Sequence, residues 1–99
     1  MGQKAVLLWF RKELRPKGYL EEIVIWKIPV STEFPEGVKY RLALVHPTEQ
    51  RVAVLFANHK PKGHHQYLKN GQEIRYDFIS LEQLNRDFRS AVSKILEEE

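Results

Sequence analysis

The segment KPKGHHQY, residues 60–67, concentrates side chains that could carry out acid and base chemistry. It contains two adjacent histidines, His64 and His65, and a tyrosine, Tyr67. Histidine has an ordinary pKa that lets it both accept and donate a proton near neutral pH. Cleavage of a phosphodiester needs a base, an acid and positive charge for the pentavalent intermediate. The residue types in this segment therefore fit phosphodiester cleavage.

The positive charge for this reaction can come from lysine and arginine without a metal ion. Lys60 and Lys62 lie within a few residues of the two histidines. Gly63 would let the backbone turn sharply or approach a phosphate closely. On a nearby stretch of the chain, Lys39 and Arg41 are the further residues that we predict to contact nucleic acid.

A metal site is not expected in this segment, and we predict no cofactor. Adjacent histidines point in divergent directions in most backbone conformations, and the segment contains no carboxylate. The chain also has no cysteine, which excludes disulfides, thiolate zinc sites and cysteine nucleophiles. The alternative interpretation of the segment is a polar surface connection between strands.

Charge is distributed unevenly along the chain, although the net charge is only +3. Residues 4–17 carry five basic and one acidic side chain, and residues 38–76 carry seven basic and two acidic. The remainder is acidic, with four basic and ten acidic side chains. This asymmetry favours an anionic partner, either nucleic acid or an acidic protein segment. Solvated strand faces are the alternative explanation.

Length and composition indicate one domain, residues 1–99, with an ordinary hydrophobic content of 42%. No apolar run approaches the roughly 20 residues of a membrane span. The longest run, residues 5–10, is too short for a secretory signal and is followed by RKELRPK. We therefore expect a cytoplasmic protein without membrane contact.

The hydrophobic pattern predicts strands followed by one helix. Apolar and alternating stretches indicate strands over residues 5–10, 19–30, 38–46, 51–58 and 74–78. The third and fourth of these read as an antiparallel hairpin. The predicted fold class is α+β, an antiparallel meander sheet of four to five strands with a C-terminal helix packed on one face. The other face then meets solvent or a partner.

The helix, residues 80–96, has the best-specified start. Ser80 and Gln83 have the spacing of a capping box, and Ile79 and Leu84 occupy the positions of a hydrophobic staple. Residues expected to face the sheet are Leu84, Phe88, Val92 and Ile95.

Four aromatic residues fall at strand spacing, and this spacing favours core positions over a platform for stacking bases. They are Trp9, Trp26, Tyr40 and Phe56.

The succession of segments resembles the small TumE-type toxins of prokaryotic toxin-antitoxin systems. The resemblance runs over roughly residues 4–96 and is carried by EEIVIWKIP, KYRLALV, a strand ending in FANH, KGHHQY and the capped helix LEQLNRDF. It implies a cytoplasmic toxin that acts on RNA or translation and is neutralised by a cognate antitoxin.

Matched position by position, Asn58, Lys62, Gly63 and His65 agree with the family pattern. His64 stands where the family usually has aspartate. Tyr67 stands where it usually has a second histidine. A tyrosine can donate a proton but is a poor base near neutral pH.

The resulting prediction is a TumE-like toxin with a metal-independent ribonuclease mechanism. His65 is the general base or acid, Tyr67 or His64 is its partner, and Lys62 with Arg41 stabilises phosphate charge. One alternative is a module that binds nucleic acid without catalysis. Another is an interaction protein whose open sheet face forms a homodimer or holds an antitoxin peptide.

Overall fold

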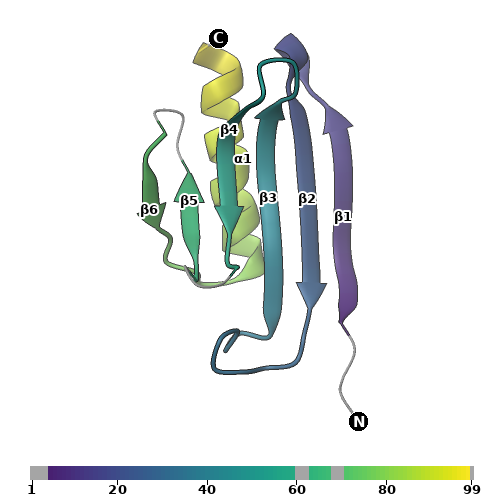
Figure 1. The fold of residues 1–99 in the computed structure, drawn as a ribbon, viewed down its shortest axis with the longest axis vertical. Coiled ribbons are helices and arrows are strands. Elements are labelled where there is room, and N and C mark those ends of the chain that lie inside the picture. Colours follow the sequence, from purple (N-terminus) through teal and green to yellow (C-terminus); the bar gives the residue numbers. More distant parts are fainter. Residues whose placement is uncertain (1–4, 60–62, 68–70, 99) are drawn as a thin grey trace.

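The computed structural model describes residues 5–59, 63–67 and 71–98 of the chain. These residues form six strands, one short 3-10 helix and one α-helix (Figure 1). In chain order they are β1 (Val6–Leu14), the 3-10 helix η1 (Pro16–Gly18), β2 (Leu20–Lys27), β3 (Val38–His46), β4 (Arg51–Ala57), β5 (His65–Tyr67), β6 (Glu73–Arg75) and α1 (Leu81–Glu98). Every strand pairs antiparallel with its sequence neighbours, and the sheet order is β1-β2-β3-β4-β5-β6. The predicted α+β meander with a C-terminal helix is confirmed.

The number of strands differs from the prediction, since the sheet has six strands and four to five were expected. The additional strand is β5, which lies inside the segment that we interpreted as a loop. Three residues are too few for alternation of polar and apolar side chains to be recognised. β1 also continues past the predicted end at residue 10, because RKEL remains paired with β2.

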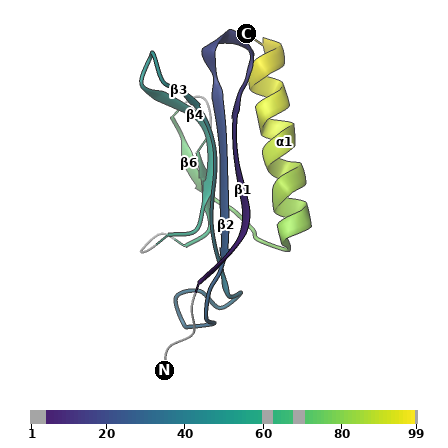
Figure 2. The ribbon, with the colours of Figure 1, turned by 90° about the vertical axis from the view of Figure 1, so that its right-hand side faces the viewer.

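One face of the sheet is apolar and is covered by α1 (Figure 2). Strand residues at alternate positions point to this face, and the helix presents residues three and four apart to it. The buried core residues include Tyr19, Ile23, Ile25, Tyr40, Leu42, Leu44, Val54, Phe56 and Tyr76, with Leu84, Phe88, Val92 and Ile95 from the helix. The predicted buried face of the helix is therefore confirmed.

The opposite face of the sheet, which we call the open face, has no other described element over it (Figure 2). Of the four aromatic residues expected in the core, Tyr40 and Phe56 are buried and Trp9 packs against the core. Trp26 is 36% exposed, so the expectation for this residue was wrong. Its strand alternation placed it correctly on the face opposite Ile25, but no helix covers that face.

The start of α1 is only partly as predicted. The Ser80 hydroxyl accepts a hydrogen bond from the backbone N–H of Gln83 at 3.1 Å, which is one half of a capping box. The Gln83 side chain does not complete the box, because it contacts Asp87 and Arg86. The hydrophobic staple contributes little, since Ile79 is 76% exposed.

No helix in the described ranges is long and apolar enough to cross a membrane.

The turn between β1 and β2 is connected to the end of β3 and to the end of α1. Lys17 and Gly18 both have positive φ, 66° and 85°. The Lys17 carbonyl accepts a hydrogen bond from His46 Nε2 at 3.1 Å, and its ammonium donates to the carbonyl of Leu96 at 2.9 Å. His46 Nδ1 accepts from the backbone N–H of Glu49, which leaves Nε2 as the donating nitrogen.

Candidate functional site

The register of the sheet places predicted site residues in two rows on the open face. Opposite residues of antiparallel strands project to the same side of a sheet. One row consists of Phe10, Val24, Arg41, Ala57, His65 and Arg75. The next consists of Lys12, Glu22, Ala43, Leu55, Tyr67 and Glu73. Arg41, His65 and Tyr67 therefore share the open face.

Arg41 and His65 lie in one row but are separated by β4, which contributes Ala57 between them. Neighbouring strands are about 4.8 Å apart, so the two backbones are about 10 Å apart. The Arg41 guanidinium is 3.4 Å from the carboxylate of Glu22, in the adjacent row. Arg41 can approach a phosphate near His65 only if its side chain turns away from Glu22.

His65 is held by a hydrogen bond to the turn before it. Its Nδ1 lies 2.8 Å from the carbonyl oxygen of Gly63, and a carbonyl can only accept, so Nδ1 carries a proton. In the neutral ring the lone pair is then on Nε2. Gly63 has a φ of 68°, a conformation in which residues with a Cβ are strained. The turn thus fixes both the orientation and the tautomer of His65.

Access to His65 is restricted. The residue is 4% exposed, and the ring of His59 packs edge-on against it with the ring centroids 4.9 Å apart. His59 is itself exposed and follows the end of β4. The ring of His59 thus contributes to the burial of the His65 ring.

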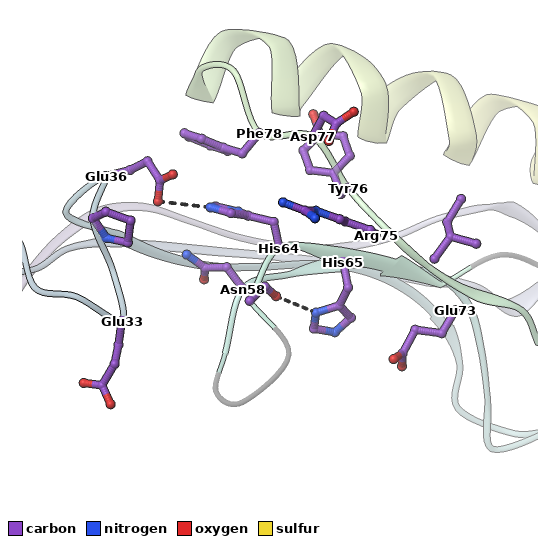
Figure 3. A pocket seen from close by; sticks show the side chains of 13 residues that line it. Glu33, Glu36, Asn58, His64, His65, Glu73, Arg75, Tyr76, Asp77 and Phe78 are labelled. Atoms are coloured by element: carbon purple, nitrogen blue, oxygen red, sulfur yellow. Dashed lines mark hydrogen bonds and ion pairs between the residues drawn. The ribbon is translucent and has the colours of Figure 1, made fainter.

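His64 points to the other side of the sheet and joins a network that the sequence did not predict (Figure 3). Its Nε2 is 3.0 Å from Glu36, and its Nδ1 is 2.7 Å from the hydroxyl of Tyr40. Phe78 stacks on the His64 ring with the centroids 4.8 Å apart. We call Glu36, His64 and Tyr40 the His64 network.

The direction of the hydrogen bonds in the His64 network follows from Glu36. A carboxylate can only accept, so His64 Nε2 carries the hydrogen and donates to Glu36. In the neutral ring Nδ1 is then the acceptor, and the Tyr40 hydroxyl donates to it. Burial raises the pKa of the Tyr40 phenol well above its usual value, and the negative charge of Glu36 contributes further, so the hydroxyl keeps the proton that it donates. Both ring nitrogens of His64 have partners within the chain.

Asn58 is a buried polar residue with a structural role. Pairing of β4 with β3 ends at Ala57, and the Asn58 side chain takes over beyond that point. Its Oδ1 accepts from the backbone N–H of Tyr40 at 2.9 Å, and its Nδ2 donates to the carbonyl of Val38 at 2.8 Å. Asn58 thus holds the start of the segment containing the histidines against β3.

A cavity of about 680 Å³ lies beside the His64 network (Figure 3). It is lined by Glu33, Pro35, Glu36, Asn58, Gly63, His64, His65, Glu73, Ile74, Arg75, Tyr76, Asp77 and Phe78. Four of these side chains are carboxylates, against one arginine. This charge is unfavourable for a phosphate. His65 and Arg75, which the register places on the open face, also line this cavity.

Of the predicted cationic residues, Lys39 and Arg41 lie on the open face, and Lys39 is opposite Trp26. Lys60 and Lys62 lie outside the described residues. Among residues 5–59, 63–67 and 71–98, no three histidine or carboxylate side chains come together in a way that could hold a metal ion.

Scans against protein-family models, curated proteins and solved structures found no match to this chain.

Proposed function

We propose that the chain is a metal-independent ribonuclease with His65 as its central catalytic residue. The observation that carries the proposal is the hydrogen bond between His65 Nδ1 and the carbonyl of Gly63. Catalytic histidines need a fixed tautomer and orientation, and a backbone carbonyl on Nδ1 supplies both. The same open face carries Arg41 and Tyr67.

In this mechanism His65 Nε2 removes the proton from a ribose 2′-hydroxyl, and the 2′-oxygen attacks the adjacent phosphorus. The bond from phosphorus to the 5′-oxygen breaks as that oxygen receives a proton from the Tyr67 hydroxyl. The products are a 2′,3′-cyclic phosphate and a 5′-hydroxyl. Once its side chain turns away from Glu22, Arg41 provides positive charge for the pentavalent intermediate.

Tyr67 is better placed than His64 to act with His65. It is two residues further along β5, about 6.6 Å away in an extended chain, and projects to the same face. His64 projects to the opposite face and has both nitrogens engaged with Glu36 and Tyr40. We therefore propose Tyr67 as the acid and a positioning role for His64.

The biological setting that we propose is that of a TumE-like toxin acting on RNA in a prokaryotic cytoplasm and neutralised by a cognate antitoxin. This part of the proposal rests on the resemblance of KYRLALV, FANH and KGHHQY to the family. The ribonuclease chemistry can be tested without it.

The test is cleavage of end-labelled RNA by purified protein in the presence of a chelator. We compare the parent with His65→Asn, Tyr67→Phe and His64→Asn. Asparagine at position 65 keeps a donor for the Gly63 carbonyl but has no proton acceptor in place of Nε2. We expect cleavage to fall by roughly 10²- to 10⁴-fold in His65→Asn. A parent protein that leaves RNA intact, or a His65→Asn variant with full activity, overturns the proposal.

The second candidate function is an interaction protein, and the edge of the sheet favours it. Among the described residues β1 is an edge strand that pairs only with β2, and its large apolar side chains reach solvent, with Phe10 61% and Leu14 83% exposed. Such an edge can accept a strand from a second copy or from an antitoxin peptide. Analytical ultracentrifugation of the purified chain tests the homodimer. A chain that sediments as a monomer at high concentration rules the homodimer out.

A further inference from the structure

A second, smaller cavity lies on the open face next to the row that contains His65. It measures about 290 Å³ and is lined by Val24, Trp26, Lys39, Tyr40, Arg41 and His59. Trp26 is an exposed aromatic residue on the inner strand β2, although an uncovered tryptophan costs hydrophobic free energy. The cavity thus combines a solvent-exposed indole with cations on the neighbouring strand.

The charge around this cavity matches a nucleic-acid strand. Lys39 lies directly opposite Trp26 in the register, and Arg41 is two residues further along the same strand. None of the six residues that line the cavity is acidic. Arg41 does pair with Glu22, but this contact is long, 3.4 Å, and solvent-exposed. Exposed ion pairs of this kind are weak, so a phosphate can replace the carboxylate.

We propose that Trp26 is a stacking platform for one unpaired base of single-stranded RNA, with the flanking phosphates bound by Lys39 and Arg41. The indole offers a flat apolar surface on which any base can stack. Bases inside an A-form duplex are already stacked on each other, and side chains cannot reach them through its narrow major groove. The substrate class of the open face is therefore single-stranded RNA. The place of cleavage rests on the proposed ribonuclease function. The binding of single-stranded RNA rests on the cavity alone.

The positions of Trp26 and His65 give the path of the bound RNA across the sheet. Trp26 and His65 are on strands β2 and β5, three steps apart, which is about 14 Å across the sheet. Arg41 lies between them on β3. A strand that stacks on Trp26 and contacts Arg41 therefore crosses the β-strands toward His65. Cleavage then occurs at a fixed number of nucleotides from the stacked base.

The experiment separates binding from cleavage with a short 2′-O-methyl oligoribonucleotide, which has no 2′-hydroxyl to attack. Trp9→Phe provides a protein in which Trp26 is the sole tryptophan, because the chain has two. We measure the fluorescence of Trp26 and the affinity for the single strand and for its duplex. The variants are Trp26→Ala, Trp26→Phe and Leu14→Ala. Leu14 is the control because it is an exposed apolar residue at the end of β1, whereas Trp26 lies opposite Leu7, near the start of that strand.

We expect the single strand to quench Trp26 and to bind at least about tenfold more tightly than the duplex. Trp26→Ala should weaken that binding by roughly tenfold to a hundredfold, whereas Trp26→Phe and Leu14→Ala should retain most of it. Equal affinity for single strand and duplex, unquenched fluorescence, or a Trp26→Ala variant that binds like the parent each overturns the inference.

Failure of the proposed function gives a different result. If the oligonucleotide binds and quenches Trp26 but unmodified RNA is never cleaved, the stacking platform stands and the ribonuclease does not. If unmodified RNA is cleaved by Trp26→Ala at the parent rate and with the parent pattern, the ribonuclease stands and the platform does not.

Discussion

The hydroxyl of Tyr40 donates a hydrogen bond to Nδ1 of His64 at 2.7 Å, although the two residues are 24 positions apart in the chain. Tyr40 belongs to β3, and His64 comes immediately before β5. The contact joins the centre of the sheet to the start of the strand that carries His65. The opposite nitrogen of His64 reaches Glu36, in the connection between β2 and β3.

Loss of this contact should reduce stability. Tyr40→Phe removes the hydroxyl and leaves His64 Nδ1 without its donor, at a cost of about 1–3 kcal/mol in the free energy of unfolding. Urea denaturation measures this change. Tyr67→Phe is the matched control, because that hydroxyl lies on the open face and outside the His64 network, and it should change stability by less than about 0.5 kcal/mol. Equal effects of the two variants would contradict the assigned role of Tyr40.

Alkaline pH should destabilise the fold through the same tyrosine. Burial raises the pKa of Tyr40 above that of a free phenol, about 10, so the unfolded chain loses this proton at lower pH than the folded chain. The stabilisation is complete below about pH 10 and is lost as pH rises above it, with a slope of about 1.4 kcal/mol per pH unit for one group. Denaturation between pH 9 and 11 checks the slope, which should be smaller in Tyr40→Phe. A remaining slope is expected from Tyr76, whose pKa is raised by burial and by its hydrogen bond to Asp87.

Asn58 should be hard to replace, because its side chain satisfies two backbone groups of β3. Asn58→Ala leaves the N–H of Tyr40 and the carbonyl of Val38 unpaired, at about 1–3 kcal/mol for each group. Asn85→Ala is the control, since Asn85 Oδ1 is buried without a hydrogen-bond partner in the described part of the chain. That substitution should be neutral or stabilising. Thermal unfolding of both variants decides the prediction, and a neutral Asn58→Ala would refute it.

Alanine substitutions at two glycines distinguish the cost of backbone strain from the cost of a steric contact. Gly18 and Gly71 have similar φ values, 85° and 81°. A Cβ at Gly18 would lie 2.9 Å from His46 Nε2, whereas no atom of the described residues is within 4 Å of one at Gly71. Gly71→Ala should cost about 1–2 kcal/mol for the left-handed conformation alone, and Gly18→Ala should cost more. Equal values in urea denaturation would show that His46 gives way without cost.

RNA affinity should fall steeply with salt, because each phosphate that the open face neutralises releases a counterion. Lys39→Ala and Arg41→Ala should each reduce the slope of log affinity against log salt by about one. Lys94→Ala, on the exposed side of α1, should leave the slope unchanged. Fluorescence anisotropy measures these slopes. Absent binding at about 50 mM salt would refute both the ribonuclease and the binding module.

Much of the fold could be predicted because its signals are local. The alternation in VKYRLALVH gave the bounds of β3, and the three-and-four spacing of Leu84, Phe88, Val92 and Ile95 gave the buried face of α1. Ser80 marked the start of the helix through its hydroxyl. Each of these signals is contained within a few residues and needs no knowledge of the rest of the chain.

The parts that escaped prediction depend on contacts between distant segments. Glu36 and His64 are 28 residues apart, and no pattern near either one predicts that they meet. β5 is stabilised by its neighbours on both sides and not by its own three residues. The exposure of Trp26 follows from which face the helix covers, and strand alternation alone does not specify that.

Because every strand pairs with its neighbour in sequence, the chain can fold by adding one hairpin at a time, and few contacts require distant segments to meet early. Such topologies close short loops and tend to fold quickly for their size. The same arrangement makes the local stability of the sheet uneven, because β5 and β6 have only three residues each and form one margin of the sheet. Amide hydrogens there should exchange with solvent well before those of β2 and β3. We therefore expect the margin of the sheet that includes the strand bearing His65 to open at a lower free energy than the centre of the sheet.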